Sequence, residues 1–129
     1  MANWIIYDYV HPIQGNLIRA WSEGLQKKER AKLNAKLDAL EMHGTGLIPG
    51  MLVPTGVANI FKLRVRGQVE LRPMICEGPG RDERCFTLLL GAIEVEWVLQ
   101  PEDAAAAAAD CRTDLIANPR RRVPHERVN

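Results

Sequence analysis

Residues 60–74, IFKLRVRGQVELRPM, show the strongest pattern in the chain, an alternation of apolar and basic side chains. The first basic residues are Lys62, Arg64 and Arg66, and the apolar ones between them are Phe61, Leu63 and Val65. Side chains alternate across a β-strand, so the pattern predicts a strand with one face in the core and one cationic face.

The tripeptide RGQ at 66–68 predicts a tight turn into a second strand over 68–76. In this hairpin Arg72 joins the cationic, solvent-facing side. The residues expected on the core face are Val69, Leu71 and Ile75. Like charges set across a sheet repel each other, so an anionic ligand is a suitable counter-charge. A solvated sheet face fits the same pattern, and both interpretations remain open.

The remaining periodicity predicts an α+β fold. Strands are expected at 3–10, 84–91 and 93–99, and helices at 16–25, 27–44 and 101–117. The glycine- and proline-rich segment 44–56 is expected to be a loop. We therefore expect a small antiparallel or mixed sheet of four to five strands, an N-terminal helical hairpin on one face, and a C-terminal helix. Residues 1–118 are expected to form a single domain, followed by a basic tail, 119–129, which is too polar to fold alone.

The net charge of +1 conceals a segregation of charge along the chain. Residues 27–66 contain eight lysines and arginines against three acids, whereas residues 73–118 contain three against nine. The tail, 119–129, has four arginines and one glutamate. Such sorting favours a positive face for a polyanion on a nearly neutral protein.

Cysteine spacing and hydropathy exclude some classes of protein. Cys76, Cys85 and Cys111 lie far apart, without a CxxC motif or a histidine at a ligand spacing, so we expect reduced structural thiols and no metal site. A contact between Cys76 and Cys85 stays open if their strands pair. No apolar run reaches 18 residues, and the N-terminus lacks a signal-peptide pattern. We therefore expect a cytoplasmic protein with no membrane partner and no cofactor.

The element order, together with the motifs KLRVR, ELRPM, FTLLLGAIE, PEDA and RRRVPHER, resembles the RelE/HigB toxins of bacterial type II toxin–antitoxin systems. The phage-derived RelE-like subgroup is the most similar. The resemblance covers residues 60–128 by motif and the first 45 residues by element order only. It implies a ribosome-dependent endoribonuclease that cuts mRNA and is neutralised by a cognate antitoxin, a small helix-turn-helix protein.

The resemblance also implies functional residues. Arg64 and Arg72 match the basic positions that hold the reacting phosphate, where arginine suits the developing charge. Further RNA- or phosphate-binding positions are expected at Lys62, Arg66, Arg120, Arg121 and Arg122. The three tail arginines fit a disordered basic end equally well.

The segment before the last helix departs from the family pattern. Active members have lysine, arginine, tyrosine or histidine there, whereas residues 90–101 read LGAIEVEWVLQP. His125 in the tail, or His43 at the end of the long helix, is a candidate for proton transfer, because imidazole titrates near neutral pH. Each also fits a surface or capping role.

Three functions therefore stay open. The first is an RNA-cleaving or translation-blocking toxin. The second is a binding protein without nuclease chemistry, like the ParE relatives that poison DNA gyrase. The third is a phage structural or interaction module with a phage-protein partner, because a fold alone does not settle function.

Overall fold

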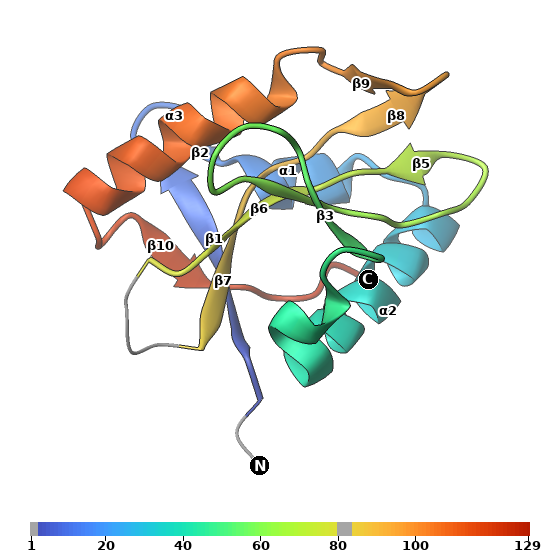
Figure 1. The fold of residues 1–129 in the computed structure, drawn as a ribbon, viewed down its shortest axis with the longest axis horizontal. Helices are drawn as coiled ribbons and strands as arrows, with labels where there is room; N and C mark the ends of the chain where they lie inside the picture. The colour runs from blue at the N-terminus through green and yellow to red at the C-terminus, as the bar shows by residue number, and fades with distance from the viewer. Residues whose placement is uncertain (1–2, 80–83) are drawn as a thin grey trace.

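The computed structural model describes residues 3–79 and 84–129, and this part of the chain forms an α+β fold with three α-helices and a seven-stranded mixed sheet (Figure 1). The strand order is β10-β1-β7-β6-β4-β3, and the short β2 pairs with β1. β1 runs parallel to β7, and the other neighbours in this sheet are antiparallel. The predicted fold class is confirmed, but the sheet is larger than the four to five strands expected.

The helices are α1 (Leu17–Glu23), α2 (Lys27–His43) and α3 (Ala104–Ala117), and a short 3-10 helix, η1, covers Gly44–Leu47. The strands of the large sheet are β1 (Ile5–His11), β2 (Gly15–Asn16), β3 (Leu52–Pro54), β4 (Phe61–Leu63), β6 (Met74–Glu77), β7 (Cys85–Leu90) and β10 (Arg122–Pro124). A smaller, three-stranded sheet consists of β5 (Glu70–Leu71), β8 (Ile93–Val95) and β9 (Val98–Gln100).

Both faces of the large sheet are covered by helices. Leu88 of β7 packs in one core cluster with α1 and α2, and the next residue, Leu89, packs in a second cluster with α3. Neighbouring residues of a strand point to opposite faces, so α3 lies on the face away from the helical hairpin. The expected stripe of α2 is confirmed, since Leu33, Leu37 and Leu40 are buried. The predicted helices 16–25, 27–44 and 101–117 thus correspond to α1, α2 and α3.

Two segments that looked unsuited to strands extend the large sheet. β3, from the glycine- and proline-rich segment, pairs with β4 at one edge. β10, from the basic tail, pairs with β1 at the other edge. Edge strands tolerate proline because one side of the backbone needs no partner. The expectation of a plain loop over 44–56 was therefore wrong for Leu52–Pro54.

The tail continues past β10 along α2. The Asn34 side-chain amide donates to the Val128 carbonyl at 3.0 Å, and Arg127 forms ion pairs with Asp38 and Glu41. The tail has few apolar residues of its own, so its order comes from the β1 edge and from these contacts with α2.

The hairpin of 60–76 is more bent than expected. β4 ends at Leu63, and Val65 and Leu71 form only an isolated bridge before β6 pairs with β4. Leu71 and Ile75 are buried as predicted, but Val69 is exposed in the turn. Between β4 and β6 the chain leaves the large sheet, and β5 joins β8 in the smaller one.

The predicted strand 93–99 was wrong, because this segment folds as a hairpin. β8 and β9 pair around Glu96 and Trp97, which both have positive φ, 50° and 69°. Two left-handed residues at the centre of a two-residue loop fit the twist of the flanking strands. Figure 1 shows β5, β8 and β9 together at one end of the molecule.

Candidate anion-binding site

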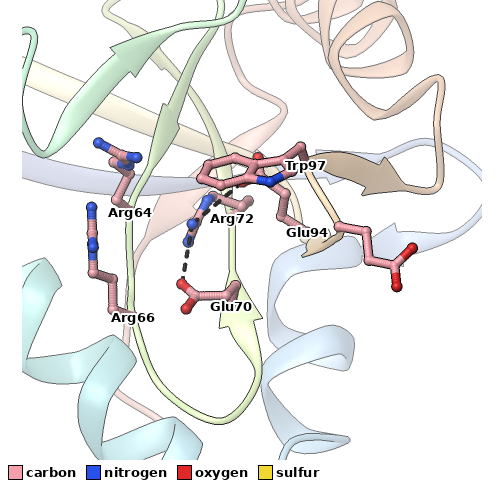
Figure 2. A pocket seen from close by; sticks show the side chains of 7 residues that line it. Arg64, Arg66, Glu70, Arg72, Glu94 and Trp97 are labelled. Atoms are coloured by element: carbon pink, nitrogen blue, oxygen red, sulfur yellow. Dashed lines mark hydrogen bonds and ion pairs between the residues drawn. The ribbon is translucent and has the colours of Figure 1, made fainter.

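A pocket of about 280 Å³ opens between the chain that follows β4 and the β8–β9 hairpin. It is lined by Arg64, Arg66, Glu70, Arg72, Glu94, Glu96 and Trp97. The bend after β4 places Arg64 and Arg66 opposite this hairpin, which carries Glu94 and Glu96. Figure 2 shows Arg64 and Arg66 at one edge of this pocket and Trp97 at another, with the guanidinium of Arg72 between them. We call it the Arg72 pocket.

Arg72 forms the buried floor of the pocket, with only 3% of the residue exposed. Its Nη1 donates to the Leu71 carbonyl at 2.8 Å, and its Nη2 lies 3.1 Å from Glu70 Oε2 and 3.6 Å from Glu94 Oε2. The expectation that Arg72 faces solvent beside Arg64 was wrong. Its charge is balanced inside the protein because two carboxylates of the small sheet close over it.

Glu94 joins this floor to Lys62. The Nζ of Lys62 donates to Glu94 Oε1 at 2.8 Å, and Lys62 does not line the pocket. This hydrogen bond lowers the pKa of the Glu94 carboxyl, the charges of Lys62, Arg72 and Arg64 lower it further, and burial opposes them. Glu94 is therefore ionised at neutral pH, and the charge of Lys62 is also balanced internally.

Arg64 and Arg66 differ from Arg72, because neither has an ion-pair partner within the residues that the structure describes. The Arg64 side chain is half-buried and that of Arg66 is exposed. The backbone amide of Arg64 donates to the Met51 carbonyl of the neighbouring segment at 2.8 Å, which holds this residue in place. We refer to these two side chains as the arginine rim.

The turn after Arg66 rests directly on α2. A Cβ added to Gly67 would lie 2.7 Å from Lys32 Nζ and 3.2 Å from Glu29 Oε2, and the side chain of Lys28 donates to Gln68. These contacts leave little space under the turn. The helix thus positions the rim, although none of its residues was predicted to do so.

A second pocket, of about 320 Å³, adjoins the first. It is lined by Lys36, Gly50, Met51, Arg64 and Arg66, so the rim lies between the two pockets. Three of these five residues are cationic, and none is acidic. Sequence reasoning missed Lys36, because its position on the polar face of α2 resembles that of any solubilising lysine. We call this second site the Lys36 pocket.

Trp97 at the hairpin tip is the largest exposed side chain of the Arg72 pocket, with 88% of its surface accessible. From the sequence alone, Trp97 fits the core and a partner surface equally well. The turn lacks the glycine or asparagine that marks most two-residue hairpin loops, so the signal for its position was absent.

His125 is not among the residues that line either pocket. Its side chain is 3% exposed, and its Nδ1 lies 2.7 Å from Asp8 Oδ1. The other oxygen of Asp8 accepts from Asn16 at 2.9 Å. This arrangement links the tail to β1, so the structure does not bring His125 to the arginines. His43 is exposed at the end of α2.

The tail arginines lie near β10, at the opposite edge of the sheet from β3 and β4. Arg121 forms an ion pair with Asp114, and the Arg122 guanidinium lies 4.1 Å from the centre of the Tyr7 ring. Arg120 is exposed. The site residues expected from the sequence are therefore divided between two distant regions, and only Arg64, Arg66 and Arg72 line a common pocket.

The cysteines are buried in the core. Burial raises the pKa of the Cys76 thiol to about 12 and that of Cys111 to about 11. Cys76 lies opposite Thr87 rather than Cys85 in the strand register. Among residues 3–79 and 84–129, no cluster of three histidine, cysteine or acidic side chains is arranged to hold a metal ion.

No helix in the described part of the chain has both the length and the apolar character needed to cross a membrane. Comparison of the chain with protein-family models, with curated proteins and with solved structures gave no match. The two pockets and the sequence motifs are therefore the features of this chain that bear on its function.

Proposed function

We propose that the protein is a toxin of the RelE type that inhibits translation by binding the phosphodiester backbone of mRNA at the arginine rim. The observation that carries this proposal is the pair Arg64 and Arg66, which stand without ion-pair partners among the described residues and lie between two pockets. Guanidinium groups grip phosphate oxygens in a bidentate fork, and Lys36 adds a third positive charge. A cognate antitoxin would neutralise the toxin.

RNA cleavage in this site would proceed by attack of a ribose 2′-oxygen on the adjacent phosphorus. The 2′-hydroxyl loses its proton to a base, the bond to the 5′-oxygen breaks, and that oxygen takes up a proton. Arg64 and Arg66 are suited to stabilise the charge that gathers on the phosphate oxygens. Among the described residues that line the pocket, Glu96 is the carboxylate outside the ion pairs of Lys62 and Arg72, so it is the group available for proton transfer.

A second candidate is binding of RNA, or of another polyanionic target, without cleavage. One observation favours it: among the described side chains that line the Arg72 pocket there is no histidine, tyrosine or lysine, and Glu70 is paired with Arg72. The ribosome-bound mRNA would then be blocked rather than cut. A gyrase-type inhibitor and a phage interaction module would likewise act by binding a partner without nuclease chemistry.

Induced expression in a bacterium separates these functions. Growth and the 5′ ends of cellular mRNA are followed for the wild type and for the Arg64→Ala/Arg66→Ala variant. The charge-matched control is Arg19→Ala/Arg112→Ala, which removes one arginine from α1 and one from α3, neither of which lines either pocket. We expect growth arrest with the wild type and the control, and normal growth with the rim variant.

The RNA ends then determine the mechanism. New 5′ ends inside translated frames, absent with the rim variant, would establish cleavage. Arrest without such ends would establish the non-cleaving inhibitor. Normal growth on expression of folded wild-type protein would overturn the toxin proposal and favour the phage module.

A further inference from the structure

We propose that Trp97 is a stacking platform for one base of a single-stranded RNA whose phosphates lie on the arginine rim. This inference rests on the proposed function and specifies its ligand. A duplex hides the faces of its bases, whereas a single strand offers every base for stacking. The Arg72 pocket thus provides one wall for a base and one edge for the backbone.

The exposure of Trp97 supports this role. With 88% of its surface accessible, the side chain contributes almost nothing to the core. An indole left in water forgoes the stabilisation that burial of so large an apolar surface provides. The neighbouring guanidinium groups are in turn suited to phosphate rather than to apolar partners. Nucleotides combine these two chemistries in a single ligand.

The backbone at the tip of the β8–β9 hairpin also supports a stacking role for Trp97. Trp97 has φ of 69°, a left-handed conformation that bulky residues rarely adopt. The preceding residue, Glu96, has φ of 50°. Folding alone would favour asparagine followed by glycine in such a turn. The hairpin therefore holds an indole at the pocket in a position where a smaller residue would fold more easily.

The pocket dimensions fit one nucleotide unit. A volume of about 280 Å³ lies just below the range of about 300–1,000 Å³ for drug-sized ligands, so it suits a single nucleotide unit better than a longer ligand. The floor is neutralised because Arg72 and Lys62 pair with Glu70 and Glu94. Of the other charged side chains that line the pocket, Arg64 and Arg66 outweigh Glu96, so a net positive charge stays at the rim. From the rim, the adjoining Lys36 pocket offers a further cationic surface for the next phosphate.

The test compares two probes of equal length, about eight units, within the usual footprint of single-strand binding sites. One is a labelled oligouridylate, and the other is the abasic oligomer, which keeps the sugar–phosphate backbone and lacks bases. Binding to the full chain is measured by fluorescence anisotropy at low ionic strength. The variants are Trp97→Ala, Trp97→Phe and Arg64→Ala/Arg66→Ala.

We expect Trp97→Ala to weaken oligouridylate binding about tenfold and to leave the abasic oligomer within about twofold. Trp97→Phe keeps most of the affinity, because phenylalanine also stacks. The rim variant weakens the binding of both probes. Circular dichroism of each variant checks that the fold is intact.

Two results separate this inference from the proposed function. Unchanged oligouridylate affinity in Trp97→Ala, with weak binding by the rim variant, would overturn the stacking role and leave RNA binding in place. Trp97 would then be a contact for a protein partner. Failure of the wild type to bind either probe would overturn RNA binding itself.

Discussion

Replacing the hairpin tip with a better turn sequence, Glu96→Asn/Trp97→Gly, is predicted to stabilise the protein. Both positions have positive φ, 50° and 69°, which a residue with a branched or bulky side chain adopts at a cost of about 1–2 kcal/mol. Glycine carries no such cost, and asparagine carries less of it than most residues. The Trp97 side chain is 88% exposed, so its removal takes little from the core.

The expected gain is the relief of strain minus the entropy that glycine adds to the unfolded chain. Relief at Trp97 is worth about 1–2 kcal/mol, and relief at Glu96 adds a few tenths. The added freedom of glycine takes back about 0.5–1 kcal/mol. The free energy of unfolding should therefore rise by about 1 kcal/mol, which corresponds to roughly 4 °C in the melting temperature of a domain of this size.

Urea unfolding followed by far-UV circular dichroism measures this change without relying on tryptophan emission. The Trp97→Ala variant is the matched control, since alanine removes the indole but keeps the left-handed strain. We expect its stability within about 0.5 kcal/mol of the wild type. If the Asn-Gly variant is less stable than Trp97→Ala, the tip is not strained, and the indole is not held there against folding preference.

Three further perturbations test the rest of the structure. Arg72→Ala is expected to lower the free energy of unfolding by about 3–5 kcal/mol in urea denaturation, because Glu94 loses a buried partner, whereas Arg64→Ala changes it by less than about 1 kcal/mol. Folding lowers the pKa of Glu94 from 4.5, so ionised Glu94 stabilises the folded protein above pH 4.5, and this stabilisation is lost as the pH falls below that value. Urea denaturation between pH 3 and 7 should show a smaller loss of stability at low pH in Glu94→Gln than in the wild type. Gly91→Ala places a Cβ 1.9 Å from a packed indole carbon and should cost about 1–3 kcal/mol in thermal unfolding, whereas Gly46→Ala, with open space around it, provides the control.

Long periodic segments of this chain were predictable, and the irregular ones were not. The stripe of Leu33, Leu37 and Leu40 indicated α2, and a proline and two acids followed by a run of alanines indicated α3. Segments 52–54 and 122–124 gave no strand signal, because their pairing depends on the exposed edges of β4 and β1. Local propensity carries no information about such distant partners.

The sequence predicted only part of the candidate site, because the geometry of the site also depends on contacts between distant segments. Alternation placed Arg64 and Arg66 on a polar face, but it assumed a flat hairpin. The bend after β4 and the hairpin at Glu96 and Trp97 rotated Arg72 into a buried ion-pair network. The hairpin turn used residues that rarely form it, so neither the network nor the tryptophan at its edge was visible in the pattern.

The basic and acidic segments of the sequence come together at the Arg72 pocket in the folded chain. Lys62 of the basic segment pairs with Glu94 of the acidic segment across the two sheets, and Arg72 pairs with the same carboxylate. This pairing removes Lys62 and Arg72 from the positive charge that the pocket offers to a polyanion. Of the basic side chains around the two pockets, Arg64, Arg66 and Lys36 remain for a ligand. A site with so few cations needs a second source of affinity, and Trp97 supplies it through stacking, which weakens less with salt than phosphate contacts do.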